Sequence, residues 1–192
     1  MRNRQAEAVK QLTDRELLLN VYLTQIILVI LAGVISLFLF QDMWFFADLI
    51  HFTWTEIIVL GGGTAFLVIG IDLILMKTLP EEMLDDGGIN ERIFSRLSIS
   101  HIFFLCAIIS FSEELLFRGV IQTSFGLVLS SLLFALIHVR YLSKPVLFSS
   151  VVVISFLIGV LYEVTDNLMT TITAHFLIDF VMACLIKQKA RM

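Results

Sequence analysis

Two consecutive glutamates, Glu113 and Glu114, lie in an apolar stretch and are followed four positions later by Arg118. A charge inside a bilayer costs roughly 2.5–3.5 kcal/mol on insertion scales, so it rarely occurs there without a partner or a function. On a helix, Glu114 and Arg118 share one face and can form an ion pair. Glu113 points about 100° away from Glu114 and is predicted to be free of that pair. A carboxylate left free in an apolar setting is suited to general acid/base chemistry.

Two histidines occur in later apolar stretches, each in a spacing that places it on a shared helical face. Phe134 precedes His138 by four positions, and His175 precedes Asp179 by four. A single histidine of this kind is commonly a hydrogen-bonding group between helices, and His175 with Asp179 could be a satisfied pair. The two histidines and the charged residues together are less easily explained by structure alone.

Depth along the predicted helices permits these groups to meet. At 1.5 Å per residue, Glu113 lies ~15 Å and His138 ~21 Å from the outer turn near Thr123. His175 lies ~12 Å from Asn167, at the outer end of its own helix. We therefore expect Glu113, His138 and His175 to converge near the middle of the membrane.

The composition is that of an integral membrane protein. Of the 192 residues, 58% are hydrophobic, and the mean hydropathy is +0.95, which excludes an ordinary soluble domain. Runs of about 20 apolar residues predict transmembrane helices. We predict an all-α integral membrane protein with six such helices, of which the fourth and fifth are short, over residues 17–40, 56–76, 102–121, 125–139, 146–162 and 168–186.

The basic residues predict the topology. Lysine and arginine are present in the N-terminal tail, the second and fourth loops and the C-terminal tail, and they are absent from the first, third and fifth loops. Because basic residues favour the cytoplasmic side, both termini are predicted to be cytoplasmic and the protein to be multi-pass in the cell membrane. We divide the chain into residues 1–98 with two helices and a charged connector, a four-helix core over 99–187, and a basic tail over 188–192.

Other features have structural interpretations. A second pair, Glu81-Glu82, lacks the following arginine and belongs to the solvated connector. Gly61, with Ala65 four residues later, indicates close helix packing. The two cysteines, Cys106 and Cys184, are interpreted as small apolar residues rather than a disulfide or a metal cluster.

The order of the three motifs resembles the CPBP family, which comprises type II CAAX prenyl endopeptidases and bacteriocin-processing or immunity-type membrane proteins. The motifs are Glu113-Glu114-x-x-x-Arg118, Phe134-x-x-x-His138 and His175-x-x-x-Asp179, and the resemblance covers about residues 100–185. The short chain is similar to bacterial members. Asp179 departs from the asparagine of the eukaryotic prenyl proteases, and an ionised aspartate cannot donate a hydrogen bond to an oxyanion.

The resemblance implies an intramembrane endopeptidase acting on a membrane-associated protein or on a lipidated or hydrophobic peptide, with no nucleic-acid partner. Glu113 and His138 would activate a water, and His175 with Asp179 would stabilise the oxyanion. Glu114, Arg118 and Phe134 would support the site. Glu113, His138 and His175 also form a possible zinc ligand set. Prenylation of the substrate does not follow from the sequence.

Two other functions use the same polar residues. A secondary transporter also places charged groups at mid-membrane, although six helices without an evident repeat make a small transporter. A non-catalytic bacteriocin-immunity or membrane chaperone-like protein would use the polar cavity for binding. Such a binding protein would keep its function when Glu113 becomes glutamine, whereas a protease would lose it.

Overall fold

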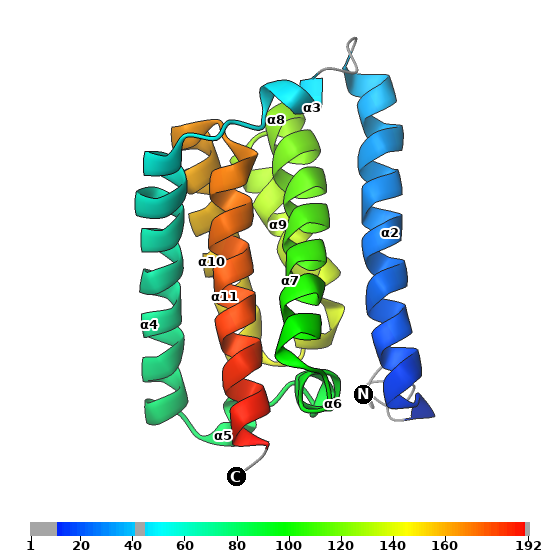
Figure 1. Ribbon diagram of the computed structural model, residues 1–192, viewed down its shortest axis with the longest axis vertical. Coiled ribbons are helices and arrows are strands. Elements are labelled where there is room, and N and C mark those ends of the chain that lie inside the picture. Colours follow the sequence, from blue (N-terminus) through cyan, green and yellow to red (C-terminus); the bar gives the residue numbers. More distant parts are fainter. Residues whose placement is uncertain (1–10, 41–44, 191–192) are drawn as a thin grey trace.

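The computed structural model describes residues 11–40 and 45–190, and within these ranges the chain is helical without a strand (Figure 1). Five helical stretches are long and apolar enough to cross a membrane. They are α2 (Asp14–Leu39), η1 with α4 (Glu56–Gly61 and Gly62–Thr78), α7 with η2 and α8 (Ile99–Glu114, Leu115–Gln122 and Thr123–Phe125), α10 (Pro145–Thr165) and α11 (Leu168–Lys189). The shorter apolar helix α9 spans Leu127–Ile137. The remaining short helices are α3 (Phe45–Asp48), α5 (Glu81–Leu84), α6 (Ile89–Phe94) and η3 (Val139–Tyr141). The predicted all-α membrane architecture is confirmed.

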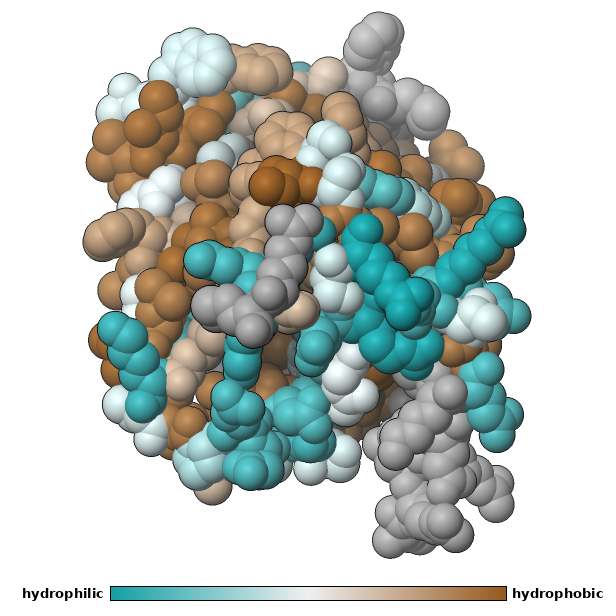
Figure 2. All heavy atoms as spheres, turned by 60° about the horizontal axis from the view of Figure 1, so that its bottom comes forward, coloured by the Kyte–Doolittle hydropathy of each residue, from teal (hydrophilic) through white to brown (hydrophobic). Residues whose placement is uncertain are grey.

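The two described ends of the chain lie on the same side of the bundle. Arg92, in the connector between α4 and α7, pairs with Asp14 at the start of α2, with 3.0 Å between nitrogen and oxygen. At the end of α11, Lys187 donates to the Ser95 carbonyl at 2.9 Å. Figure 2 shows hydrophilic side chains gathered on this end, whereas apolar side chains cover the flanks. The common side agrees with the predicted topology, and its assignment to the cytoplasm stays a prediction.

The two helices predicted to be short differ in the structure. Helix α9 has 11 residues, roughly 16 Å at 1.5 Å per residue, about half of the ~30 Å hydrocarbon core of a bilayer. The fifth, α10, is not short, because it runs for 21 residues from Pro145 to Thr165. Pro145 begins the helix at a position where its missing N–H is tolerated. The prediction ended at residue 162 because Glu163 was assigned to a loop, whereas the helix continues past it to Asp166, where φ is +47°.

The third membrane helix changes its winding at the glutamate pair. Helix α7 ends at Glu114, and residues Leu115–Gln122 form the π-helix η2. The backbone N–H of Thr123 bonds to the carbonyl of Arg118, five residues earlier, and the Thr123 hydroxyl donates to the same oxygen at 3.1 Å. Short π-helical insertions are frequent at functional sites. The sequence prediction of an uninterrupted helix missed this segment.

The glycine predicted to allow close packing does so against the last helix. A Cβ on Gly61 would lie 2.8 Å from the backbone oxygen of Thr170 in α11, whereas a Cβ on Gly62 or Gly63 would meet nothing within 4 Å. Ala65, one turn further, is 1% exposed. The Gly61 position therefore brings η1 against α11, which carries His175.

Gly61→Ala should destabilise the protein, because the added methyl group overlaps a backbone oxygen that cannot move aside easily. Overpacking of this kind costs about 1–3 kcal/mol. The matched controls are Gly62→Ala and Gly63→Ala, which should be neutral or stabilising by about 0.5–1 kcal/mol because alanine favours helix. Thermal unfolding in detergent would measure the difference, and equal midpoints for all three variants would contradict this packing.

Candidate active site

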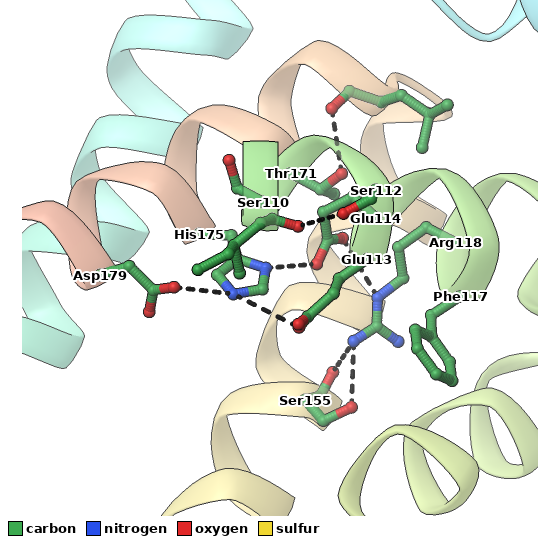
Figure 3. A network of polar contacts seen from close by, with 12 residues as sticks. Ser110, Ser112, Glu113, Glu114, Phe117, Arg118, Ser155, Thr171, His175 and Asp179 are labelled. Carbon is green, nitrogen blue, oxygen red and sulfur yellow. Dashed lines mark hydrogen bonds and ion pairs between the residues drawn. The ribbon is translucent and has the colours of Figure 1, made fainter. Parts of the chain in front are cut away.

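The two consecutive glutamates approach the same histidine from two sides (Figure 3). His175 donates from Nδ1 to Glu114 Oε1 at 2.9 Å. Its other ring nitrogen, Nε2, lies 3.9 Å from Glu113 Oε2. Both carboxyl groups are at the end of α7, and the histidine is on α11, 61 residues after Glu114. The predicted convergence of Glu113 and His175 is present in the structure.

Arg118 is the best-satisfied polar group of the bundle. Its Nε donates to Glu114 Oε2 at 3.3 Å, which is the predicted ion pair, and both side chains are fully buried. Its Nη1 donates to Gln122 Oε1 at 3.2 Å and to Ser131 Oγ at 3.4 Å. Two more go to the backbone and side-chain oxygens of Ser155, each at 3.0 Å. All five N–H groups of the guanidinium thus have acceptors, from α7, η2, α9 and α10.

Glu114 joins this arginine network to the histidine. One of its oxygens accepts from Arg118 and the other accepts from His175. The sequence indicated only the pairing with Arg118, because the contact with His175 depends on how α7 packs against α11. A carboxylate that accepts from Nδ1 fixes the orientation of the imidazole and turns Nε2 toward Glu113.

Asp179 stands near the second nitrogen of His175. Its Oδ2 lies 3.5 Å from Nε2, one helical turn along α11. Asp179 is close enough to interact with His175, but the shorter contact to the ring is that of Glu114, and an orienting role of Asp179 stays a prediction. Glu113 and Asp179 thus both face His175 Nε2, and Glu114 holds Nδ1.

His138 lies directly after the end of α9 and belongs to the same cavity. Its Nδ1 donates to the Phe134 carbonyl at 2.8 Å, so the neutral ring offers the lone pair of Nε2 to another donor. Phe134 packs its ring against His138 and His175, with centroids 4.9 and 6.0 Å apart. The Arg118 guanidinium carbon lies 5.5 Å from the centre of the same ring. Phe134 therefore separates the arginine network from the cavity and holds both histidines.

One cavity of about 920 Å³ brings the candidate residues together. Glu113, Phe134, His138, His175 and Asp179 all line it. The cavity reaches the connector side, where its lining includes Asp86, Asn90 and Arg140; there Arg140 pairs with Asp86 and donates to Asn90.

The first helix also lines this cavity, through Gln25 among others. Sequence reasoning assigned the site to the core at 99–187 and missed Gln25. The one feature of the sequence that could have pointed to Gln25 is that it is a polar amide within an apolar helix.

The predicted zinc ligand set is not assembled in the described residues, which contain no group of three histidine, cysteine, aspartate or glutamate side chains arranged to hold a metal ion. Nδ1 of His138 bonds to the Phe134 carbonyl and Nδ1 of His175 bonds to Glu114, so Nε2 of each ring is the nitrogen that could bind a metal. Zinc dependence stays a prediction.

Comparison with known proteins adds a family match. The model of the family described as "Type II CAAX prenyl endopeptidase Rce1-like" matches residues 95–181, a range that contains the three motifs. The chain is also similar to a Bacillus subtilis (strain 168) protein named "Uncharacterized protein YpbD", with 48% identity over 165 residues, which are 86% of this chain and 87% of that protein. No solved structure matches the chain.

Arg118→Met should strongly destabilise the bundle, since it leaves the buried Glu114 carboxylate without its charged partner. Breaking a buried pair by removing one member costs about 3–5 kcal/mol. Arg96→Met is the matched control, because Arg96 pairs with Asp14 at 2.8 Å but its side chain is 79% exposed, and surface pairs contribute about 0–1 kcal/mol. The stability of both variants would be measured by their abundance in the membrane and by thermal unfolding in detergent. Similar losses in the two variants would contradict the central role of Arg118.

Proposed function

The chain belongs to the type II CAAX prenyl endopeptidase Rce1-like family, and we propose that it is an intramembrane endopeptidase that hydrolyses a peptide bond by means of an activated water. The observation that carries the proposal is the placement of Glu113. Its carboxyl group is buried, lines a large cavity and faces His175, while the neighbouring Glu114 is fully committed to Arg118 and His175. A carboxylate without a structural partner of its own is what a general base requires.

The proposed reaction begins with a water bound between Glu113 and His138. Glu113 takes a proton from the water as its oxygen attacks the carbonyl carbon of the substrate, and Nε2 of His138 accepts the other water hydrogen as a hydrogen bond. The carbonyl oxygen becomes an oxyanion, which His175, held by Glu114 and Asp179, stabilises. The C–N bond then breaks, and the proton on Glu113 passes to the departing amine nitrogen. The products are a new carboxyl group and a new amino group.

The cavity suits a substrate segment that comes from the membrane surface. Apolar side chains of α2, α6 and α11, such as Val21, Phe94 and Met182, line it between Glu113 and the polar connector side. We therefore propose a membrane-associated protein or a hydrophobic peptide as the substrate. Nothing in the cavity lining requires that this substrate be prenylated.

The alternative is a binding protein, such as an immunity or chaperone-like protein, built on the same cavity. The extensive hydrogen bonding of Arg118 and Glu114 would serve either function, because it organises the bundle. The two proposals differ at Glu113, whose only charged neighbour at less than 4 Å within the described chain is His175.

Glu113→Gln should abolish proteolysis without loss of protein, since the amide keeps the size of the side chain but cannot accept the proton. Loss of a general base lowers rates by roughly 10²- to 10⁴-fold. The measurement is profiling of N-terminal peptides in membranes of cells that carry wild type or the variant at equal abundance. New N-termini that depend on Glu113 would identify the substrates.

The matched control is Glu82→Gln, in the second glutamate pair, whose side chain is exposed on α5. Its profile should equal that of wild type. Indistinguishable profiles for Glu113→Gln and wild type, with the cellular phenotype kept, would favour the binding protein.

Chelation gives a separate test of the metal-free mechanism. Treating the purified, reconstituted protein with 1,10-phenanthroline should leave cleavage unchanged, because the described side chains do not form a ligand set. Loss of cleavage that added zinc restores would instead establish the zinc site predicted at Glu113, His138 and His175.

A further inference from the structure

Gln25 is a buried amide in the middle of the apolar helix α2, outside the family-matched range of 95–181. It is 5% exposed and lines the same cavity as Glu113, His138 and His175. An amide taken out of water costs free energy unless both of its ends find hydrogen-bond partners. Each end of the Gln25 carboxamide is therefore expected to have a hydrogen-bond partner.

One end of the Gln25 carboxamide is held by the residue before the candidate base. Ser112 Oγ donates to Gln25 Oε1 at 2.6 Å, across the contact between α2 and α7. The same hydroxyl also lies 2.7 Å from the carbonyl oxygen of Ile108, so its single proton is shared between acceptors at nearly equal distance. Because Ser112 is adjacent to Glu113 in the chain, this bond places the carboxamide at the depth of the candidate base.

The other end of the carboxamide is the Nε2 amino group, which the bond to Ser112 does not use. Among the described residues, the one buried side-chain nitrogen or oxygen that lacks a partner and is closed off from open space is Thr170 Oγ1. Nε2 of Gln25 is not such an atom. Because Gln25 lines the cavity, we infer that Nε2 is open to it. Gln25 thus presents two N–H groups to the site.

Other donors near Glu113 are already committed. Arg118 uses all five of its N–H groups within the protein. His138 donates to Phe134, and His175 donates from Nδ1 to Glu114. Nε2 of His175, the oxyanion donor proposed above, also lies beside the carboxylates of Glu113 and Asp179, so a second donor would be needed. Asp179, as a carboxylate, is an acceptor. An oxyanion that forms beside Glu113 needs a donor that is already aimed at it.

We propose that Gln25 Nε2 donates a second hydrogen bond, beside that of His175, to the carbonyl oxygen of the cleaved peptide bond and stabilises the oxyanion formed on it. The inference rests on the proposed endopeptidase function and adds α2 to the catalytic machinery. Gln25 neither takes up nor releases a proton, and Ser112 acts as its positioning residue by holding Oε1. The arrangement accounts for a polar residue in α2 that faces the site from outside the family-matched segment.

The test uses the full-length protein in proteoliposomes and a synthetic peptide that spans the cleavage site found by the Glu113-dependent profiling. Gln25→Met keeps the length of the side chain without the amide, and Gln25→Glu keeps an acceptor for Ser112 but loses the donor. Loss of an oxyanion donor lowers kcat by roughly 10²-fold or more, and KM should stay near that of wild type because the bond strengthens in the transition state. Ser112→Ala should lower kcat less, since it loosens the carboxamide without removing it.

Ser36→Ala is the matched control for a change in α2. Ser36 is a buried polar residue of the same helix that donates to Gly33 within it, so its removal should leave kcat unchanged. Full kcat in both Gln25 variants, with an active wild type, would overturn the role of Gln25 and leave the proposed function standing. A fall in kcat/KM that comes from KM alone, or that parallels a lower thermal midpoint, would also overturn it. A wild type without activity toward any peptide would overturn the proposed function and this inference together.

Discussion

The buried ion pair between Arg118 and Glu114 links the helices that surround the candidate site. A guanidinium and a carboxylate inside a membrane protein are expensive to desolvate, and the cost is offset only when their hydrogen-bonding groups are satisfied. Here the acceptors for Arg118 come from Gln122, Ser131 and Ser155, and Glu114 passes the network on to His175. The helices η2, α9, α10 and α11 are therefore tied to one point, and their relative positions follow from it.

This network also explains why Glu113 and Glu114, although adjacent in the chain, have different roles. Glu114 has one oxygen on Arg118 and the other on His175, which makes it a structural and orienting group. Glu113, one residue earlier, points into the cavity and faces only the far nitrogen of the same histidine. Adjacent side chains on a helix diverge by about 100°, so one residue can belong to the core while its neighbour belongs to the site. The π-helix that begins directly after the pair rewinds the segment and brings Arg118 to its acceptors.

The cavity is bounded on one side by the Arg118 network and on the others by helices from separate parts of the chain. The Arg118 network joins η2, α9, α10 and α11. The ring of Phe134 lies between this network and the cavity and packs against both histidines. The cavity lining also includes residues of α2 and α6, which precede the family-matched segment. The short helix α9 ends at Ile137, and His138 follows as a capping residue with its Nδ1 tied to the preceding turn. An abrupt helix end at this depth is tolerated where the backbone is buried in protein or lines a cavity.

The class of the protein, the approximate helices and the residues that could do chemistry were predictable from the amino-acid sequence. These are local properties, because hydrophobic runs define membrane helices and isolated charges within them are conspicuous. The Glu114–Arg118 pair was predictable for the same reason, since both residues lie within one helical turn. The contact between Glu114 and Nδ1 of His175 and the place of Gln25 in the cavity lining came from the three-dimensional arrangement. Both depend on contacts between helices far apart in sequence, and the energy of a buried polar contact is set by which partner the packing supplies rather than by local pattern. The full length of α10 and the π-helical winding of η2 are backbone details that hydrophobic runs alone do not specify.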